Sequence, residues 1–548
     1  MMSELTSNGL KKQLVNWNHI NWKKVNKAVR NLRQRIFRAS QLGDFRKLRN
    51  LQKLMQRSYA NLLLSVRRIT QTNLGKATAG IDKEIVNTPE QRVILVNNWQ
   101  GGNLKPTRRV EIPKPNGKFR PLGIPTVRDR IEQAMVLNAL EPEWEAVFEQ
   151  NSYGFRPGRS CQDAIEQSFN LLSRWHNWVL EADIKGFFDN IAHESILNMV
   201  SNFPKRELIK GWLKAGFVFQ GHLHLTEQGT PQGGVISPLL ANIGLHGLET
   251  YIKATNPKFG VVRYADDFIV TAKDKESLET AQNLIQAWMS KRGLELSAEK
   301  TVITSMEEGF DFLGFNSRHY DGKLLIKPSK KKVLTFCKRI GKEIKNLNGV
   351  EQEVLIYKLN PILRGFANYY KAVVSKETFG YISHRVWQYL WRWAKRRHPN
   401  KNSKWVRWRY FKTIKGNKWV FACTTSDRQG KDKELVLYQI AYTPIERHIK
   451  VKGDASPDDP SLKEYWRKRH QKFGKSRFEK GSKLYKIAEN QNWICPECGE
   501  PLFNGEEIET HHIVPVAEGG TDDVGNLQHL HKACHKQVHK TPVKTRLK

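Results

Sequence analysis

The chain has 548 residues, more than one hydrophobic core usually spans, so several domains are expected. It carries 91 Lys and Arg against 54 Asp and Glu, a formal net charge of +37 that favours a large polyanion as partner. No apolar stretch is long enough to cross a bilayer, and no apolar run follows a basic N-terminus, so neither a membrane location nor a secretory signal is expected. Six cysteines in so long a chain do not form a disulfide framework, and we expect a reducing, cytoplasmic setting.

The first segment, to about residue 69, predicts two helices with basic outer faces. Its only acidic residues are Glu4 and Asp44. One apolar stripe at helical spacing consists of Val25, Val29, Leu32 and Ile36, and a second of Leu48, Leu51, Met55, Tyr59, Leu62 and Val66. Such faces can present charge to a phosphate backbone, or they can be the solvated sides of helices packed on the main body.

From residue 109 to about 318 the pattern is mixed α/β, with turn signals between short strands and helical stretches. Residues 179–184 predict a strand that carries Asp183. Residues 261–264 and 268–270 predict a hairpin whose turn contains Asp266 and Asp267. Hard cations such as Mg²⁺ prefer carboxylate oxygen, and two such ions can activate a 3′-hydroxyl for attack on a nucleotide and stabilise the leaving oxygen. The three carboxylates therefore predict a centre for nucleotide transfer.

Residues 378–426 contain no acidic residue and interleave tryptophans with Arg and Lys. Aromatic rings can stack on exposed bases while cations contact phosphates, and tryptophans at helical spacing can equally form a core. The arginines of this segment that we expect to contact RNA are Arg392, Arg396, Arg397, Arg407 and Arg409. Residues 454–460, rich in Pro, Asp and Ser, predict a linker.

Residues 264–267, Tyr-Ala-Asp-Asp, resemble the YADD box of reverse transcriptases. Other sequence blocks of that family are found in the expected order. The segments that resemble them are residues 112–122, 152–160, 181–189, 229–238 and 312–315. The resemblance implies that Asp183, Asp266 and Asp267 hold Mg²⁺. It also implies which residues bind the dNTP. Lys114 and Arg120 would contact the triphosphate, and Gln232 would lie against the incoming nucleotide. Phe188 would be the steric gate that excludes a ribose 2′-hydroxyl.

More specifically, the chain resembles group II intron-encoded proteins. Residues 74–82 match the segment that this family has ahead of the fingers, and residues 359–370 resemble its maturase, or X, domain. The resemblance implies group II intron RNA as a partner and a role in splicing.

Near the C-terminus, two residue pairs with the same spacing predict a structural zinc site. Cys495 and Cys498 form one pair, and His531 and Cys534 form the other. Four N/S ligands in two pairs are typical of a closed Zn²⁺ site, and the alternative is a set of reduced cysteines without metal.

A second histidine set is interwoven with these ligands and resembles the HNH endonuclease motif. By that resemblance His512 is the general base, Asn526 orients the motif, and His511, His535 and His539 hold the catalytic cation, for which Mg²⁺ is expected. Target double-stranded DNA is the implied substrate.

These observations predict an α+β protein with right-hand polymerase fingers and palm, a helical thumb/X domain and a C-terminal ββα-metal zinc module. The expected regions are a basic helical extension (1–69), fingers and palm (70–320), thumb and maturase domain (321–430), a DNA-binding region and linker (431–480) and the HNH module (481–548). The expected function combines RNA-directed DNA synthesis, splicing assistance and nicking of target DNA. The alternatives are a stand-alone reverse transcriptase of retron or diversity-generating type and a splicing-only RNA-binding maturase. The sequence leaves the oligomeric state open.

Overall fold

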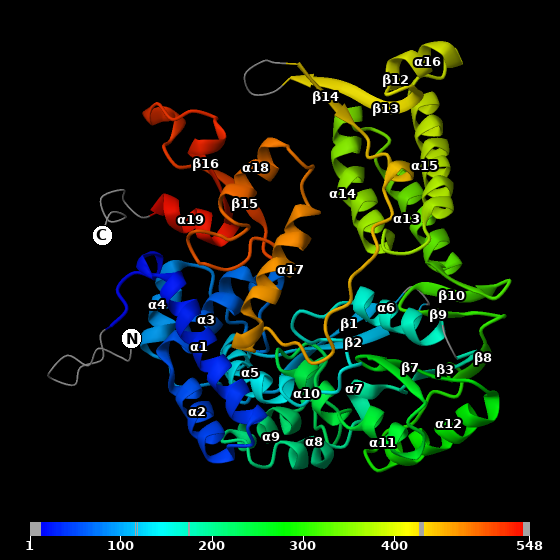
Figure 1. Cartoon of the computed structure of the whole chain (residues 1–548). Helices are drawn as coiled ribbons and strands as arrows, with labels where there is room; N and C mark the ends of the chain where they lie inside the picture. The colour runs from blue at the N-terminus through cyan, green and yellow to red at the C-terminus, as the bar shows by residue number, and fades with distance from the viewer. Residues whose placement is uncertain (1–12, 115–116, 118, 174–175, 427–431, 541–548) are drawn as a thin grey trace.

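The computed structural model of the protein describes residues 13–114, 117, 119–173, 176–426 and 432–540. Pro115, Asn116 and Lys118 of the expected fingers block lie outside the described residues. Figure 1 shows mixed α/β elements at the base, a group of helices at the upper right, and the C-terminal module at the upper left above the N-terminal helices. The predicted α+β class is confirmed. In the described part of the chain, no helix has the length and apolar character needed to cross a membrane.

The N-terminal helices differ in number from the prediction. The first stripe lies in one helix as expected, but the second is divided at Ser58, whose extended backbone ends one helix and whose side chain caps the next. The helices of this region are α1 (Trp22–Gln41), α2 (Phe45–Arg57), α3 (Tyr59–Arg67) and α4 (Pro89–Asn97). The apolar faces of α1, α2 and α3 pack on α5 (Val127–Glu145). Many of their cations face outward, but Arg67 of α3 and Arg92 of α4 are buried.

Two four-stranded sheets build the middle of the chain. The first has the order β2-β1-β4-β5 and consists of β1 (Thr107–Pro113), β2 (Phe119–Ile124), β4 (Phe217–Phe219) and β5 (His222–His224). The second has the order β6-β7-β3-β8 and consists of β3 (Trp178–Asp183), β6 (Gly260–Tyr264), β7 (Asp267–Ala272) and β8 (Val302–Ser305). The predicted strand and hairpin are therefore confirmed.

Helices cover the second sheet and bury its apolar side chains. Strands β3, β6 and β7 contribute Leu180, Val261 and Val270 to one large core. The helices of this region are α6 (Cys161–Leu172), α7 (Phe187–Asn190), α8 (His193–Met199), α9 (Arg206–Lys214), α10 (Ser237–Gly244), α11 (Leu248–Thr255) and α12 (Lys275–Ser290). A three-stranded sheet follows, made of β9 (Phe310–Phe312), β10 (Phe315–Tyr320) and β11 (Lys323–Pro328).

The helices at the upper right of Figure 1 carry the tryptophan-rich segment. They are α13 (Lys330–Asn346), α14 (Gln352–Tyr370), α15 (Lys376–Arg397) and α16 (Ser403–Tyr410), followed by the sheet of β12 (Phe411–Ile414), β13 (Asn417–Ser426) and β14 (Asp432–Val436). The tryptophans include buried rings that pack in the core and exposed rings that are accessible for stacking on bases. Trp393 is buried and Trp387 stacks on Trp391 at 6.2 Å, whereas the side chain of Trp408 is 78% exposed.

The chain then descends to the base of the molecule and rises again as α17 (Lys463–Lys475) (Figure 1). The linker expected at residues 454–460 is not a solvated connection. Ala455, Ser456 and Asp458 are buried, and Asp458 accepts two hydrogen bonds, of 2.8 and 2.6 Å, from Arg33 of α1. Its polar composition misled the sequence prediction because these polar groups are paired inside the protein.

Asp163 of α6 anchors this descending segment. Its carboxylate, 1% exposed, accepts hydrogen bonds from His448 Nε2 at 2.8 Å, Val451 N at 2.7 Å and Arg469 Nη2 at 2.9 Å. Burial alone would raise the pKa of Asp163, but the hydrogen bonds from His448 and Ser160 outweigh burial and hold it at about 2.

The charge of Asp163 should therefore stabilise the fold. Because its folded pKa lies below the unfolded value of 3.8, this stabilisation is complete above about pH 4 and is lost as pH falls through 2. Asp163→Asn should lower the free energy of unfolding by about 2 kcal/mol at pH 7. Thermal unfolding of both proteins between pH 7 and pH 2.5 measures the difference, which should shrink at the acid end. Asp454→Asn, an exposed change in the same segment, is the matched control, and a difference independent of pH would contradict the assignment.

The C-terminal module consists of α18 (Lys483–Asn490), the antiparallel pair β15 (Ile508–His512) and β16 (Leu527–His531), and α19 (Lys532–Lys540). Its apolar residues do not form a separate core. Trp493, Leu530 and Val538 belong to one buried cluster with Trp22 and Val66 of the N-terminal helices. The first and last parts of the described chain are thus packed together (Figure 1).

Candidate functional site

Three carboxylates gather where β3, β6 and β7 meet. Strand β3 pairs antiparallel with β7, which places Asp183 opposite Asp267. Tyr264 of β6 also lies opposite Asp267, so Ala265 and Asp266 form the turn between the two strands. Ala265 adopts φ 59°, a left-handed conformation that is rare for residues other than glycine. The tight turn exposes two adjacent carboxylates beside the end of β3.

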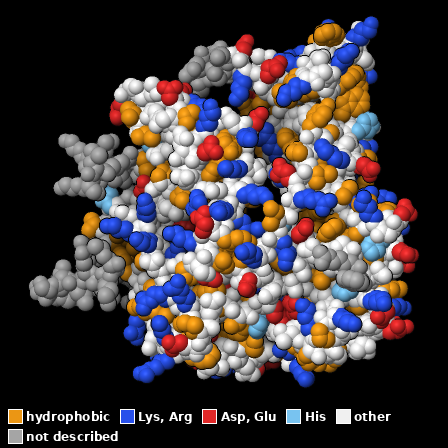
Figure 2. Space-filling model, viewed as in Figure 1, with side chains coloured by type: hydrophobic (Ala, Val, Ile, Leu, Met, Phe, Trp, Pro, Cys, Tyr) orange, Lys and Arg blue, Asp and Glu red, His pale blue; other side chains and the backbone are white. Residues whose placement is uncertain are grey.

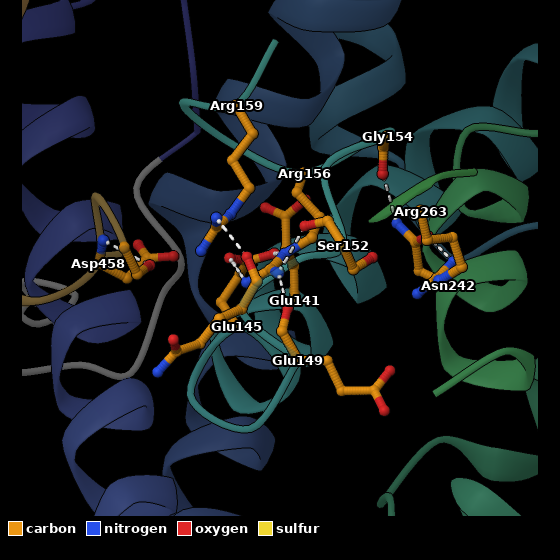
Figure 3. A network of polar contacts seen from close by, with 12 residues as sticks. Glu141, Glu145, Glu149, Ser152, Gly154, Arg156, Arg159, Asn242, Arg263 and Asp458 are labelled. Carbon is orange, nitrogen blue, oxygen red and sulfur yellow. Dashed lines mark hydrogen bonds and ion pairs between the residues drawn. The ribbon is translucent and has the colours of Figure 1, made fainter. Parts of the chain in front are cut away.

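A buried network holds this turn in place, and Figure 3 shows its members around Arg263. The Arg263 guanidinium donates to Asn242 Oδ1 at 3.0 Å and to the carbonyl of Ala265 at 3.2 Å. Asn242 donates in turn to the carbonyl of Gly154 at 2.8 Å. A Cβ at Gly154 would collide with the backbone of Ala265, so only glycine fits against the turn. Arg263 and Asn242 thereby fix the strained backbone.

The segment that contains Gly154 is itself anchored by an ion pair. Arg156 and Glu145 lie 2.9 Å apart with side chains 2% and 1% exposed. Arg156 also donates to the carbonyl of Ser152 at 2.9 Å (Figure 3). Ser152 bridges to Arg263 of β6, so this block is attached directly to the strand that leads into the turn.

The electrostatics of the cluster favour a bound cation. Burial raises the pKa of Asp267 to about 6, and the charges of Asp266 and Asp183 act in the same direction. Burial also raises the pKa of Asp266. Lys300 Nζ donates to Asp183 Oδ2 at 2.7 Å and supplies one compensating charge. Among the described residues, the donor atoms of the three carboxylates do not all lie within 4.8 Å of one another. Lys300 was not identified from the sequence, because it is far from the aspartates along the chain.

The predicted nucleotide-binding residues are only partly brought together. Arg120 Nε donates to Gln232 Oε1 at 3.2 Å. Gln232 and Phe188 line one cavity of about 430 Å³, and the ring of Phe188 lies 5.2 Å from that of Phe187. Lys114 follows β1 and is exposed. Burial raises the pKa of Asp189 in the wall of this cavity, and the charges of Arg109 and Lys114 partly offset that effect.

The predicted zinc ligands do meet. The donor atoms of Cys495, Cys498, His531 and Cys534 all lie within 4.8 Å of one another, and all four residues are buried. Nε2 of His531 lies 3.1 and 3.2 Å from the carbonyls of Pro501 and Leu502, which makes it the protonated nitrogen and leaves Nδ1 facing the thiols. Hydrogen bonds from Cys498 and Cys534 lower the pKa of the Cys495 thiol. Three thiols and a correctly oriented imidazole fit a structural metal ion.

The second histidine set also forms a cluster. His511 on β15 and His535 and His539 on α19 have ligand atoms within 4.8 Å of one another. His535 and His539 are four residues apart and share one helical face, with their Nε2 atoms 2.9 Å apart. Together the elements β15, β16 and α19 form the expected ββα arrangement.

Two carboxylates that were missed in the sequence contact His535 of this cluster and the neighbouring His512. His535 Nδ1 donates to Glu509 Oε2 at 2.6 Å, which directs Nε2 toward the cluster. His512 Nε2 lies 2.7 Å from Asp522 Oδ1. Glu509 could have been found, because it lies two residues before His511 on the same face of β15. Asp522 gave no such signal, since it reaches His512 across a loop.

Asn526 has a positional role. Its Oδ1 accepts from Val514 N at 2.8 Å, and its Nδ2 donates to the carbonyls of Val514 and Thr521 at 3.0 and 2.8 Å. These three bonds fix the loop between β15 and β16, which carries Asp522.

The five predicted RNA-contacting arginines fall into two groups. Arg392, Arg396 and Arg409 are exposed, and Arg407 is half-buried with its guanidinium over Trp419. Arg397 donates to the carbonyls of Asn348 and Val350 within the protein. Figure 2 shows Lys and Arg over much of the visible face, including its upper right, where they lie beside hydrophobic side chains.

We expect one zinc ion in the thiol cluster of the full-length protein. Cys498→Ser should remove it, because three ligands hold the ion far less tightly than four. Elemental analysis after dialysis measures zinc per chain. Cys423→Ser, which changes a half-buried cysteine outside the cluster, should keep the metal. An unchanged zinc content in Cys498→Ser would exclude this site. The full chain is the right sample, since the module shares its core with the N-terminal helices.

Four known families match successive parts of the chain. In order, these are the N-terminal domain of reverse transcriptase at residues 17–99, reverse transcriptase (RNA-dependent DNA polymerase) at 112–317, the group II intron maturase-specific domain at 333–411 and HNH endonuclease at 495–541. The second match includes the three carboxylates, and the last includes both predicted metal-ligand clusters.

Individual relatives agree with this order. Protein YkfC of Escherichia coli is 33% identical over 303 residues, which cover 46% of this chain and 79% of that protein. The group II intron-encoded protein LtrA of Lactococcus lactis is 32% identical over 319 residues, 45% of this chain and 53% of LtrA, so the match spans about half of LtrA's length. A telomerase structure from Candida albicans is similar over 55% of this chain and 64% of its own, at 14% identity and a TM-score of 0.32.

Proposed function

Because this chain belongs to the group II intron-encoded reverse transcriptases that carry maturase and HNH endonuclease domains, we propose that it serves the mobility of an intron. It would stabilise the folded intron RNA for splicing, nick target double-stranded DNA and copy the RNA from the nick. The observation that carries this proposal is the presence, in one chain, of the carboxylate turn, the maturase-specific region and the ββα histidine cluster.

For DNA synthesis, Asp183, Asp266 and Asp267 would hold Mg²⁺. Bound there, the ions would activate the primer 3′-hydroxyl and stabilise the leaving pyrophosphate. The protein's own task is to keep three repelling carboxylates at one place. The β3–β7 ladder fixes Asp183 against Asp267, and Arg263 fixes the turn that carries Asp266.

For nucleotide selection, the cavity lined by Phe188 and Gln232 would take part of the incoming dNTP, while Asp183 and Asp267 line a second cavity. Arg120 and Lys114 supply positive charge for the triphosphate, a task suited to cations. Phe188 forms part of the wall, where Phe187 and Phe155 contact its ring edge to face. A ring held in that way would exclude a ribose 2′-hydroxyl, and Gln232, which lines the same cavity, would lie against the nucleotide.

For DNA nicking, His512 would deprotonate water, with Asp522 orienting its ring. An imidazole suits this step because its pKa is ordinarily near neutrality. His511, His535 and His539 would hold the cation that stabilises the cleaved phosphate. Three imidazole donors favour a first-row transition metal over the Mg²⁺ expected from the sequence, because Mg²⁺ prefers oxygen ligands. Reduced thiols in the adjacent zinc site suit a cytoplasmic setting.

For splicing, binding alone is sufficient. A partner that binds only the folded RNA stabilises it by mass action. The exposed cations of α15 and α16 and the exposed ring of Trp408 are available for phosphates and unstacked bases. The maturase-specific region argues against a stand-alone reverse transcriptase, and the complete histidine cluster argues against a splicing-only protein.

Separate mutations should remove the two catalytic activities independently. Asp266→Ala should lower primer extension on an RNA template by about 10³-fold, because a metal ion contributes several kcal/mol to the transition state. His512→Ala should lower nicking by about 10²–10⁴-fold, the usual contribution of a general base. Each variant should retain the other activity when primer or target is supplied. Asp321→Asn and His222→Ala, both at exposed positions outside the sites, are the controls. Loss of both activities in a folded single variant would contradict the proposal.

Splicing assistance should survive when both catalytic sites are inactive. The double variant Asp266→Ala, His512→Ala should promote splicing of the cognate precursor RNA at low Mg²⁺ nearly as well as the wild type. Replacing Arg392, Arg396 and Arg409 together by Gln should weaken RNA binding. It should also reduce the slope of log affinity against log salt by about 0.7–0.9 for each phosphate that the protein no longer neutralises.

The matched control replaces three exposed lysines near α12, Lys273, Lys275 and Lys291, by Gln. It removes the same charge at a distance from α15 and α16 (Figure 1). Two outcomes would contradict the proposal that splicing assistance depends on RNA binding and not on the catalytic sites. One is a double catalytic variant that binds RNA but fails to support splicing. The other is an arginine variant that behaves like this control.

A further inference from the structure

The buried guanidinium of Arg67 lies between an aromatic ring and the thiol cluster. Arg67 is the last residue of α3 and is 4% exposed. Its Nη2 donates to Cys534 Sγ at 2.9 Å, and its guanidinium carbon lies 4.4 Å from the centre of the Trp22 ring. The chain therefore brings a cation from its N-terminal helices to a metal-ligand sulfur 467 residues away.

Charge balance explains why this contact would be stabilising. A Zn²⁺ ion held by three thiolates and one neutral imidazole carries a single net negative charge. Burying that charge in a low-dielectric interior is costly, and burying an arginine is costly for the same reason. Placed together, the two charges compensate each other. The hydrogen bond from Arg67 brings this compensating charge directly to a ligand sulfur.

We infer that Arg67, which belongs to the N-terminal helices, completes the zinc site. The zinc ion would thereby clamp the C-terminal module onto those helices. This inference rests on the proposal that the thiol cluster binds zinc. In consequence, the metal stabilises the N-terminal helices as well as the module, and loss of either partner weakens the other.

Other contacts across the same interface converge on the cluster. Asn26 of α1 donates to the carbonyl of the zinc ligand Cys498 at 3.0 Å in a buried position. Gln537 of α19 donates to the carbonyl of Ile20 at 2.9 Å. Arg30 of α1 forms an exposed ion pair with Glu500, next to Gly499. Of these contacts, the one from Arg67 goes to a metal-ligand sulfur.

The clamp also reaches the nuclease site. Helix α19 carries Cys534 of the zinc cluster, His535 of the histidine cluster directly after it, and His539 one turn further on. Its residues Gln537 and Val538 pack on the N-terminal region. The N-terminal region thus positions α19, the helix that supplies two of the three histidines of the histidine cluster.

The test measures zinc release from the full-length protein. Arg67→Gln, which removes the charge, should increase the rate of zinc transfer to a colorimetric chelator by about 10–100-fold, the factor by which losing a hydrogen-bonding partner of a ligand usually lowers metal affinity. Arg67→Lys, which keeps the charge, should have an intermediate rate. Arg30→Gln crosses the same interface without contacting a ligand and should match the wild type. In the Co²⁺-substituted protein, Arg67→Gln should shift the thiolate-to-metal charge-transfer band, and Arg30→Gln should not.

A second measurement needs no variant and applies even if Arg67→Gln does not fold. Hydrogen exchange of the wild-type chain is compared before and after zinc is removed. Amides of α1 and α3 should lose protection together with those of α18, while amides of α13–α15 keep theirs.

The outcomes are distinguishable. If the wild-type chain binds no zinc, the zinc site itself is wrong. If it binds zinc, but Arg67→Gln releases it at the wild-type rate or α1 and α3 keep their protection, the clamp is wrong and the zinc site remains.

Discussion

The antiparallel pairing of β3 with β7 is the constraint on which the rest of the molecule depends. It places Asp183 opposite Asp267, with Asp266 in the adjoining turn, and so concentrates negative charge in a partly buried position. Burial and mutual repulsion raise the pKa of Asp267 to about 6, so the arrangement opposes its own ionisation. A backbone ladder can impose this geometry because each strand is fixed by main-chain bonds that do not depend on the charged side chains.

Buried arginines connect segments that are distant in sequence around this centre. Arg263 secures the strained turn, and Arg156 with Glu145 secures the segment packed against it. Arg33 joins α1 to the descending segment through Asp458, and Arg67 joins α3 to the thiol cluster. Arg33 and Arg156 are paired with carboxylates, and removing one partner of such a buried pair commonly costs about 3–5 kcal/mol. Arg263 is held instead by hydrogen bonds to neutral oxygens. The large positive charge of the chain is thereby divided between a few internal cross-links and an exposed surface suited to nucleic acid.

Features set by short spacings in the sequence could be predicted, whereas features set by contacts between distant segments could not. The strand with Asp183, the hairpin with Asp266 and Asp267, and the Cys/His and His clusters near the C-terminus depend on motifs with spacings of a few residues. Turns, strands and helices convert such spacings directly into geometry. The second N-terminal helix was predicted as one element because its apolar stripe runs through Ser58, and stripe continuity does not reveal a cap. Residues 454–460 were mistaken for a linker because composition does not show whether polar groups are paired inside the fold.

By itself, then, the sequence determined the order of the family regions, the family and which Asp, Cys and His residues are grouped, since these depend on short motifs. The tertiary structure alone decided that Lys300 neutralises Asp183, that Asp522 and Glu509 orient histidines, and that Arg67 reaches Cys534. Such contacts join residues whose separation along the chain carries no periodic signal. They exist because apolar faces of distant elements pack into common cores, and that packing fixes which polar side chains meet.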